Sequence, residues 1–307
     1  LNSQPMGFYA PAQLIADARR HGVTVLPVDV NRSDWESTLE RPPSADGGHG
    51  KGSTALPNAA GGKARCSVRL GLQRIAGLQR RHAECLLDER RKNGPFRDAV
   101  QLARRTRLPR YVLERLAKSG AMDSLGGNRR RALWQVLEVD RKETPLLDRV
   151  EDLVHRPEET VFETLPSMTE LEEILADYRT TGHSLRGHPL AHIREALNRL
   201  RVVPASQLAE MNDGAVVRVA GIVLVRQRPG TAKGITFMTL EDESGIVNLV
   251  VRPQVWRRWR TAALEATALL AAGRLQIQQQ VIHVVAWRLE DLSCALQGLP
   301  PRSRNFC

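Results

Sequence analysis

Apolar residues recur at helical spacing between residues 70 and 125 and predict two pairs of short helices. The first pair has a tight turn at residues 75–78 and then a helix. The second pair has its turn at residues 106–109 and ends at Gly120, since glycine is a common residue just past a helix end. These patterns predict two helix-hairpin-helix motifs in tandem, although ordinary paired helices would give the same periodicity.

Apolar and polar residues alternate from residue 216 onward, which predicts β-strands. One helix interrupts the pattern between the third and fourth strands. Five strands in this order are typical of an OB-fold, a small Greek-key barrel. The expected fold class is therefore multidomain α + β, with the tandem hairpins followed by a five-stranded OB-fold barrel. The strands are expected at residues 216–227, 235–242, 246–252, 268–278 and 281–292, and the helix at 253–264.

The predicted hairpins carry one set of candidate DNA contacts. A helix-hairpin-helix motif aims free backbone amides at a phosphate, which holds a duplex without reading its bases. The candidates are Gly77, where the backbone can approach a phosphate, and the flanking residues Arg74, Arg80, Arg81 and Arg110.

The predicted barrel carries a second set of candidates. Arg226, Arg228 and Lys233 lie in its first loop, where they would follow the phosphate backbone of a single strand. Phe237 lies on the second strand, where its ring would stack on a base, or would instead fill the barrel.

Two groups of titratable residues are interpreted as structural. Glu241, Asp242 and Glu243 belong to a D-E-S-G hairpin turn, which we expect to be solvated rather than catalytic. The three histidines between residues 183 and 192 have no carboxylate or cysteine at ligand spacing, so we expect no metal site there.

The rest of the chain is organised around these parts. Residues 11–22 predict a short helix that leads into a strand-like segment, and Gly, Pro, Ser and Ala dominate residues 41–63. The expected boundaries are an ordered segment at 1–40, a flexible linker at 41–63, the hairpin region at 64–135, a helical connector at 136–204, the barrel at 205–292 and a tail at 293–307.

Positive charge is concentrated in one segment. Residues 63–149 hold 22 Lys and Arg against 10 Asp and Glu, whereas the remainder holds 23 against 24. Such a segment is expected of a protein that binds a polyanion, and nucleic acid fits better than a membrane because no amphipathic anchor accompanies it.

The cysteines and the chain start bear on cellular setting. The four cysteines are scattered without a C-x-x-C pair, and no apolar run is long enough to span a membrane. We therefore expect a cytoplasmic protein. Because the sequence begins with Leu1 inside what looks like ordered structure, we expect a piece of a longer protein.

Several ordered blocks of the sequence carry a resemblance to a known family. QPMGFYAPAQLIADARRHGV, PVDVNRSDW, LGLQRIAGL, SGAMDSLGGNRRRALWQV, DYRTTGHSL and VRVAGIVLVRQRPGTAKGITFMTLEDESG closely resemble the C-terminal portion of bacterial error-prone DNA polymerases. These are C-family enzymes similar to the DNA polymerase III alpha subunit. The resemblance implies that residues 1–40 end the fingers region, that 64–135 hold duplex DNA, and that 205–292 lie near single-stranded template.

The same resemblance implies what this chain does not contain. The catalytic aspartates of such enzymes, which bind Mg²⁺, belong to a palm domain that has no counterpart here, so no cofactor and no nucleotide addition are expected of this chain alone. Duplex and single-stranded DNA are the expected partners. A sliding clamp or a translesion accessory protein is a further one, since residues 144–148 (TPLLD) resemble a degraded clamp-binding motif. The first hairpin departs from the family pattern because it has one glycine where many have two.

Two other functions fit parts of the sequence. The barrel segment also resembles the anticodon-binding OB domain of class II aminoacyl-tRNA synthetases, which would make it an RNA-binding module. A freestanding DNA-binding adapter is the second alternative.

Overall fold

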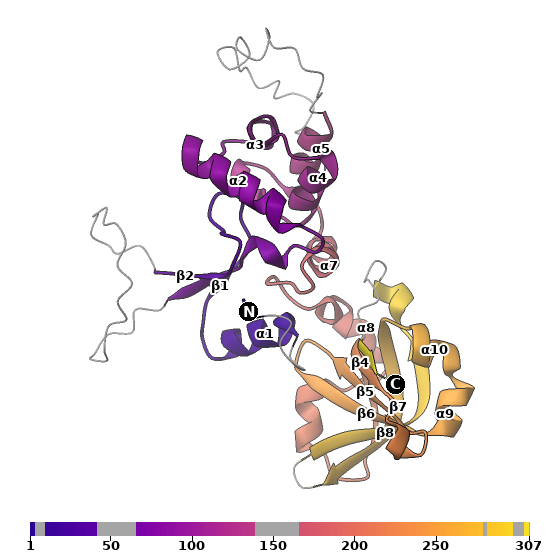
Figure 1. Ribbon diagram of the computed structural model, residues 1–307. Coiled ribbons are helices and arrows are strands. Elements are labelled where there is room, and N and C mark those ends of the chain that lie inside the picture. The colour runs from indigo at the N-terminus through magenta and orange to yellow at the C-terminus, as the bar shows by residue number, and fades with distance from the viewer. Residues whose placement is uncertain (4–9, 42–65, 139–165, 279–280, 297–303, 307) are drawn as a thin grey trace, which may run out of the picture. The chain divides into compact units, whose positions relative to one another are not determined.

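The computed structural model describes residues 1–3, 10–41, 66–138, 166–278, 281–296 and 304–306 (Figure 1). They form two compact units. We call Leu1–Thr169 with Thr180–Leu185 the hairpin unit, and Glu170–Arg179 with Arg186–Cys307 the barrel unit. In the described residues no helix is long and apolar enough to cross a membrane.

The hairpin unit combines short helices with a three-stranded sheet of order β1-β3-β2. The helix expected near residue 11 is confirmed, whereas the strand-like segment after it forms only two residues of strand. The elements are α1 (Pro11–Arg20), β1 (Val25–Leu26), β2 (Thr38–Glu40), β3 (Ser67–Arg69), the 3-10 helix η1 (Leu72–Arg74), α2 (Arg80–Asn93), α3 (Ala99–Thr106), α4 (Arg110–Lys118), the 3-10 helix η2 (Asp123–Leu125) and α5 (Arg129–Glu138).

One hydrophobic core joins the N-terminal segment to the helices. Ile15 and Val30 are buried in the same cluster as Leu72, Leu86 and Leu113. Since burial of apolar area is the main favourable term in folding, residues 10–40 and 66–136 stabilise each other as one body.

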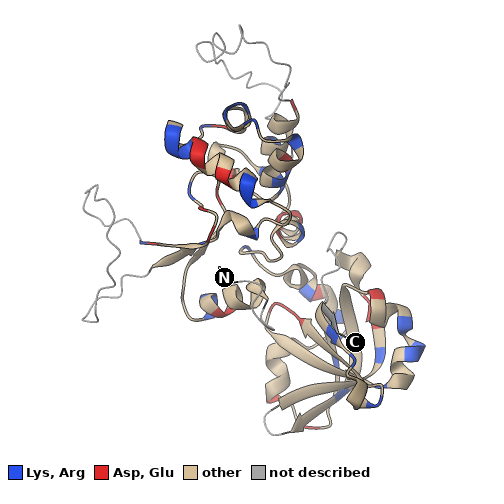
Figure 2. Ribbon diagram, viewed as in Figure 1, with Lys and Arg blue, Asp and Glu red and all other residues tan. Residues whose placement is uncertain are grey.

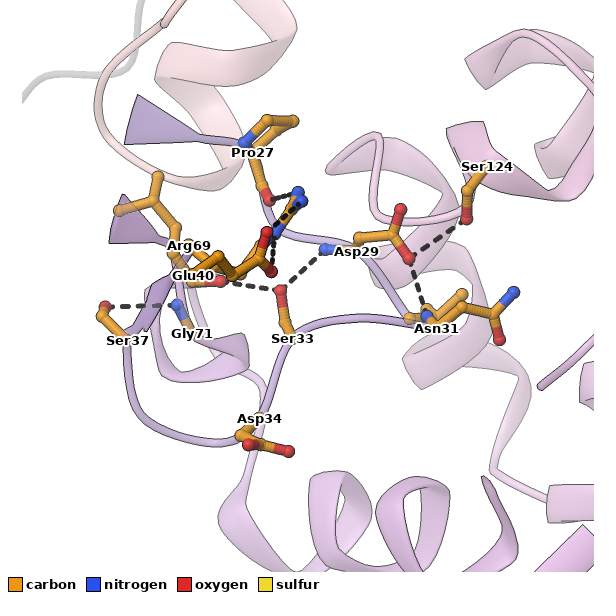
Figure 3. A network of polar contacts seen from close by, with 12 residues as sticks. Pro27, Asp29, Asn31, Ser33, Asp34, Ser37, Glu40, Arg69, Gly71 and Ser124 are labelled. Carbon is orange, nitrogen blue, oxygen red and sulfur yellow. Dashed lines mark hydrogen bonds and ion pairs between the residues drawn. The ribbon is translucent and has the colours of Figure 1, made fainter. Parts of the chain in front are cut away.

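A polar network strengthens the same junction (Figure 3). The buried Arg69 guanidinium donates to both Glu40 carboxylate oxygens, at 2.8 and 3.1 Å, and to the Pro27 carbonyl at 3.0 Å. The Ser33 hydroxyl donates to the Leu70 carbonyl at 2.7 Å and accepts from the Asp29 amide at 2.9 Å. Buried donors and acceptors are thereby paired, as a stable interior requires.

The two predicted hairpins differ in their first helix. In the second motif α3 precedes the turn and α4 follows it, as the apolar spacing predicted. In the first motif the turn before α2 follows only the three-residue η1. The first motif is therefore a shortened form of the second.

The barrel unit is a closed five-stranded barrel, as predicted. Its strands pair in the cyclic order β4-β5-β6-β8-β7, in which β6 and β8 are parallel and the other neighbours antiparallel. The strand bounds match the expected ones within a residue. The strands are β4 (Val216–Gln227), β5 (Thr236–Glu241), β6 (Ile246–Val251), β7 (Ala268–Gln278) and β8 (Val281–Asp291).

Short helices surround the barrel. The single helix expected at 253–264 is instead two, α9 (Pro253–Arg258) and α10 (Arg260–Glu265), with a break at Trp259. The 3-10 helix η5 (Gly230–Ala232) lies in the β4–β5 loop, and η4 (Ala205–Glu210) precedes β4. Upstream, α7 (Glu170–Thr180), the 3-10 helix η3 (Pro189–Ile193) and α8 (Arg194–Arg199) confirm the two helices expected there.

The expected tail is partly built into the barrel unit. The 3-10 helix η6 (Ser293–Leu296) buries Leu296 in a cluster with Leu190, Leu197 and Ile222. β9 (Arg304–Phe306) pairs in parallel with the end of β4. Within the expected tail at 293–307, apolar burial and strand pairing therefore hold these residues on the barrel unit.

Candidate nucleic-acid interface

The two hairpin turns have the same local geometry. Gly77 in the first turn has φ +74° and Arg107 in the second has φ +49°, and each is followed by a buried leucine, Leu78 or Leu108. Glycine adopts this left-handed conformation at little cost, whereas an arginine there must be held by its surroundings. The turn therefore recurs even though only the first one has the favoured residue.

Both helices that follow the turns begin without a cap. Neither Gln79 before α2 nor Pro109 before α4 makes a side-chain cap, and neither helix has an acidic residue in its first turn. The intervening α3 differs, because its N-cap Asp98 accepts from the Gln101 amide at 2.7 Å. Uncapped helix starts leave amides and a positive dipole end available to an anion.

Free amides are found where the hairpin hypothesis needs them. Among the described hydrogen bonds, the amides of Gly77, Arg80 and Arg81 have no acceptor, and neither do those of Arg110 and Tyr111. The Ala76 amide, by contrast, donates to the Thr180 carbonyl at 2.7 Å. Only part of the first turn is therefore open to a ligand.

The starts of α2 and α4 lie next to each other. The His82 ring in the first turn of α2 meets the Tyr111 ring in the first turn of α4 edge-on, with 5.8 Å between ring centroids. The Arg115 guanidinium of α4 donates to the Ala76 carbonyl at 2.6 Å. Two uncapped helix starts are thus brought to one place on the hairpin unit.

Lys and Arg recur along the helices of the hairpin unit (Figure 2). The candidate arginines among them differ in their ion pairs. Arg80 pairs with Glu84 at 2.9 Å and Arg110 pairs with Glu114 at 3.2 Å, both one turn along their helices. Arg81 is exposed and makes no ion pair among the described residues.

Arg74 is half-buried, and its Nε has no acceptor in the described structure. Burial lowers the pKa of its guanidinium. The four arginines are therefore not equivalent, and Arg81 has the least compensated charge.

Phe237 points away from the interior of the barrel. Its neighbours Met238 and Thr236 are buried, while Phe237 is 37% exposed, so its ring does not fill the barrel. On the same outer face its register partner on β6 is Val250, which pairs in turn with Val285 on β8. This arrangement leaves an aromatic face available for stacking.

Trp287 extends that face. It lies two residues beyond Val285 on β8 and is 45% exposed, at a bulge where the β7–β8 register shifts between Ala272 and Gly273 and where both Trp287 and Arg288 are exposed. Phe237, Val250 and Val285 form one row across β5, β6 and β8. Two residues along a strand span about 6.6 Å, so Trp287 lies one such step further along the same outer surface. We call this surface, made of Phe237, Val250, Val285 and Trp287, the strand face.

Basic residues border the strand face at the Trp287 end. Arg228 and Lys233 in the β4–β5 loop are exposed, and Arg252 follows β6 directly. A side chain at Gly234 would lie 3.4 Å from Pro253 and 3.6 Å from the Arg228 guanidinium, which places the loop arginine beside the start of α9.

Arg226 does not belong to this interface. It is only 5% exposed, and its guanidinium donates to the carbonyls of Ala263, at 2.7 Å, and Ala266. The expectation that it follows a phosphate backbone is wrong for this conformation, because the side chain points into the barrel and caps the end of α10. Burial also lowers the pKa of this guanidinium.

The D-E-S-G turn is not the solvated hairpin that the sequence suggested. Asp242 is buried and accepts from the amides of Ser244, Gly245 and Ala205. Arg194 donates to both Asp242 and Glu243. The turn is a structural joint between η4, α8 and the barrel.

Burial at this joint shifts the pKa values of two ionisable groups, Glu241 and His188. Desolvation raises the pKa of Glu241 to about 7, with a further contribution from the charge of Asp242. Desolvation lowers the pKa of His188 to about 4, and its Nδ1 accepts from the Leu190 amide at 3.2 Å.

The other two histidines of that stretch belong to different units. His183 is buried beside Thr181, and His192 is exposed. Within the described ranges, no group of three or more His, Cys, Asp or Glu side chains is placed to hold a metal ion. Residues 144–148, weighed as a clamp-binding motif, lie outside the described residues.

Several residues at these sites were missed by the sequence reasoning. Tyr111, Arg107 and Arg115 surround the hairpin turns, and Trp287 and Arg252 flank the strand face. A sequence repeat could have pointed to Arg107. The segments LQRRHAECL (78–86) and LPRYVLERL (108–116) share leucine, arginine, glutamate and leucine at equal spacing, so Arg107 stands directly before the second copy as Gly77 stands before the first. Trp287 could have been found from the same kind of strand alternation that pointed to Phe237.

Family models match both units. One described as a helix-hairpin-helix motif matches residues 22–132, and one described as an OB-fold nucleic acid binding domain matches residues 217–292. The chain is 48% identical over 306 residues to an error-prone DNA polymerase of Azoarcus sp. (strain BH72), covering all of this chain and 27% of that protein. It is 44% identical over 308 residues to the enzyme so named from Rhodopirellula baltica, covering 25% of it.

The relatives are longer than this chain. A Burkholderia pseudomallei error-prone DNA polymerase is 43% identical over 306 residues, which are 27% of its length. The chain thus spans about a quarter of these relatives, and it matches their C-terminal portion. Among solved structures, asparaginyl-tRNA synthetase from Pyrococcus horikoshii covers 30% of the chain at 25% identity with a TM-score of 0.26, too low to inform fold or function.

Proposed function

Because the chain is homologous along its whole length to the C-terminal quarter of error-prone DNA polymerases, we propose that it holds DNA for such an enzyme. The hairpin unit grips the duplex and the barrel unit contacts the single-stranded template. Nucleotide addition, with Mg²⁺ on palm carboxylates, would belong to a part of the polymerase outside this chain. This DNA binding would take place in the bacterial cytoplasm.

The duplex grip rests on the paired helix starts. Free amides at Gly77, Arg80 and Arg81 would donate to one phosphate, and those at Arg110 and Tyr111 to another. The helix dipoles add to each contact, and hydrogen bonds to a charged group are about 1.5–3 kcal/mol each. Contacts of this kind are to the backbone only, so binding is independent of base sequence.

The single-strand contact rests on the strand face. Phe237 and Trp287 offer two rings for stacking, and Arg228 and Lys233 lie beside them for phosphates. A stacked base is worth about 1–3 kcal/mol, and every base has a face to stack. This site therefore also predicts binding with little sequence preference.

The alternatives receive less support. The family-wide match along the whole chain favours a polymerase part over a tRNA-binding module, and a preference for duplex DNA over tRNA would separate the two. A gene that encodes a palm with paired aspartates would exclude the adapter. Recruitment by a sliding clamp or an accessory protein stays a prediction. That this chain alone does not extend a primed template also stays a prediction.

The observation that carries the proposal is the pair of adjacent, uncapped helix starts, and a glycine substitution tests it without changing charge. A Cβ at Gly77 would lie 2.1 Å from an Arg115 guanidinium nitrogen, so the substitution displaces the side chain that donates to the Ala76 carbonyl. We expect Gly77→Ala to lower duplex affinity about tenfold, since one lost charge-assisted hydrogen bond costs about 1.5 kcal/mol or more. The measurement is fluorescence polarisation with a labelled duplex.

Gly94→Ala is the matched control. Gly94 ends the same helix at φ +77°, but a Cβ there meets nothing within 4 Å. Both variants place an alanine at positive φ, where it is strained, and thermal unfolding reports the cost of each. If the two variants bind duplex equally well while both remain folded, the first hairpin is not a phosphate clamp.

A further inference from the structure

The start of the helical insertion between β6 and β7 is strongly basic although the barrel unit as a whole is not. Residues 252–260 (RPQVWRRWR) hold four arginines and no acidic residue. In the described structure none of Arg252, Arg257, Arg258 and Arg260 forms an ion pair with a carboxylate. All four are exposed. Their charge is therefore uncompensated, which is costly for a surface that meets only water and small ions.

The Trp259 ring positions two arginines of this region, Arg258 and Arg288. Trp256 and Trp259 are partly buried against the barrel core, so the opposite side of α9 carries the arginines. The Arg258 guanidinium lies 5.7 Å from the centroid of the Trp259 ring, and that of Arg288 on β8 lies 5.8 Å from the same centroid. Cation–π contacts of this kind hold guanidinium groups without neutralising them, so Arg258 keeps its charge uncompensated, whereas Arg288 also pairs with Glu290 at 2.8 Å.

This basic surface is continuous with the strand face. Val251 pairs with Ala286 in the parallel β6–β8 ladder, and the next residues on the two chains are Arg252 and Trp287. Arg288 follows Trp287, and α9 and α10 both pack against β8. A strand that leaves the Trp287 ring therefore meets Arg252 and Arg288 and then α9. We call Arg252, Arg257, Arg258, Arg260 and Arg288 the arginine shelf.

We propose that the arginine shelf is a second, phosphate-binding segment of the single-strand path, which extends the site beyond the bases that Phe237 and Trp287 stack. It rests on the proposed single-strand contact of the barrel. The strand face takes the bases, and the shelf takes the backbone of the nucleotides that follow. Single strands fit better than duplex because the shelf continues a face whose stacking rings require unpaired bases.

The test compares short and long single strands bound to the full chain. We choose oligothymidylates of about four and about twelve nucleotides, a short and a long length within the range of OB-fold site sizes. In the triple variant Arg257→Gln, Arg258→Gln, Arg260→Gln, we expect the long strand to bind about tenfold more weakly and the short strand to change by less than about twofold. The salt slope for the long strand falls by about 2, from a loss of roughly 0.7 per phosphate contact.

The control removes the same charge elsewhere in the barrel unit. The triple variant Arg199→Gln, Arg201→Gln, Arg274→Gln alters the last residue of α8, the second residue after that helix and β7, and is expected to leave both affinities within about twofold. If the two triple variants weaken the long strand equally, the shelf is only background charge and the proposal is wrong. It is also wrong if the shelf variant weakens a blunt duplex as much as the long strand.

A third variant, Phe237→Ala, separates this proposal from the proposed stacking site on which it rests. Should Phe237→Ala leave the long strand unaffected while the shelf variant weakens it, the stacking site fails and the shelf stands. Loss with Phe237→Ala but not with the shelf variant overturns the shelf alone.

Discussion

The hairpin unit and the barrel unit present positive charge in opposite ways. The hairpin unit contains the basic segment of the sequence, yet Arg80 and Arg110 are each paired with a glutamate one turn away, and Arg69 is buried against Glu40. The barrel unit holds 17 Lys and Arg against 13 Asp and Glu, a smaller excess than the 22 against 10 of residues 63–149, yet the arginines of residues 252–260 form no ion pair with a carboxylate in the described structure. Net charge by segment therefore does not measure the charge that a ligand meets.

The difference extends to the atoms that would bind. In the hairpin unit the open groups are backbone amides at two helix starts, which suit the regular phosphates of a duplex. In the barrel unit they are rings and guanidinium groups, which suit unpaired bases and a flexible backbone. Substitutions of arginine should therefore matter more in the barrel, and substitutions that change the backbone should matter more in the hairpins.

The largest expected effect separates the two arginines that frame the β4–β5 loop. Arg226→Met leaves the carbonyls of Ala263 and Ala266 without their buried donor, and we expect it to lower the free energy of unfolding by about 2–4 kcal/mol. Arg228→Met, at an exposed site, should change it by less than about 0.5 kcal/mol and weaken single-strand binding instead. Urea denaturation measures both. Equal stability of the two variants would mean that Arg226 is not structural.

A second, smaller effect concerns stacking. Phe237→Ala should cost roughly 1–3 kcal/mol of single-strand affinity, the usual worth of one stacked base, while Phe237→Tyr keeps the ring and binds like the parent protein. Duplex affinity should not change. Because Phe237 is 37% exposed and lies outside the barrel core, the alanine variant should remain folded. An unfolded variant would show that the ring is needed for packing.

The smallest expected effect tests whether the ion pair with Glu84 reduces the charge that Arg80 offers to DNA. Glu84→Gln releases Arg80 from its exposed ion pair, so duplex affinity should rise by about two- to threefold, in line with the 0.2–1 kcal/mol typical of such pairs. Glu195→Gln breaks a pair of the same spacing, with Arg199, on α8. A rise with Glu195→Gln as large as that with Glu84→Gln would mean that overall charge, and not Arg80, sets affinity. Titration at low salt gives the clearest difference.

The strand pattern was predictable because one face of each strand is buried, and this gives a period of two. Arg226, expected in the first loop, lies in β4 with its side chain inward for a specific reason. The β4–β5 register shifts between Val223 and Val225, so the bulge turns every later side chain of β4 to the other face and places Arg226 opposite the inward Met238. Nothing in the local sequence marks that bulge.

The remaining differences come from long-range contacts. Asp242 is held by the amide of Ala205 and by Arg194, which lie 37 and 48 residues away, so the turn sequence alone suggested solvent. Likewise the ladder that brings Arg252 beside Trp287 joins parallel strands distant in sequence. Local propensity predicted elements, whereas these sites depend on how the elements pair.

Residue-resolved amide hydrogen exchange, measured by NMR with and without a duplex, tests the central claim most directly. The claim is that backbone amides at two helix starts hold the duplex. The account predicts slowed exchange at Gly77, Arg80, Arg81, Arg110 and Tyr111 when duplex is bound, and little change at the start of α3, where Asp98 already caps the helix. Duplex binding that leaves the exchange of those five amides unchanged would contradict the account.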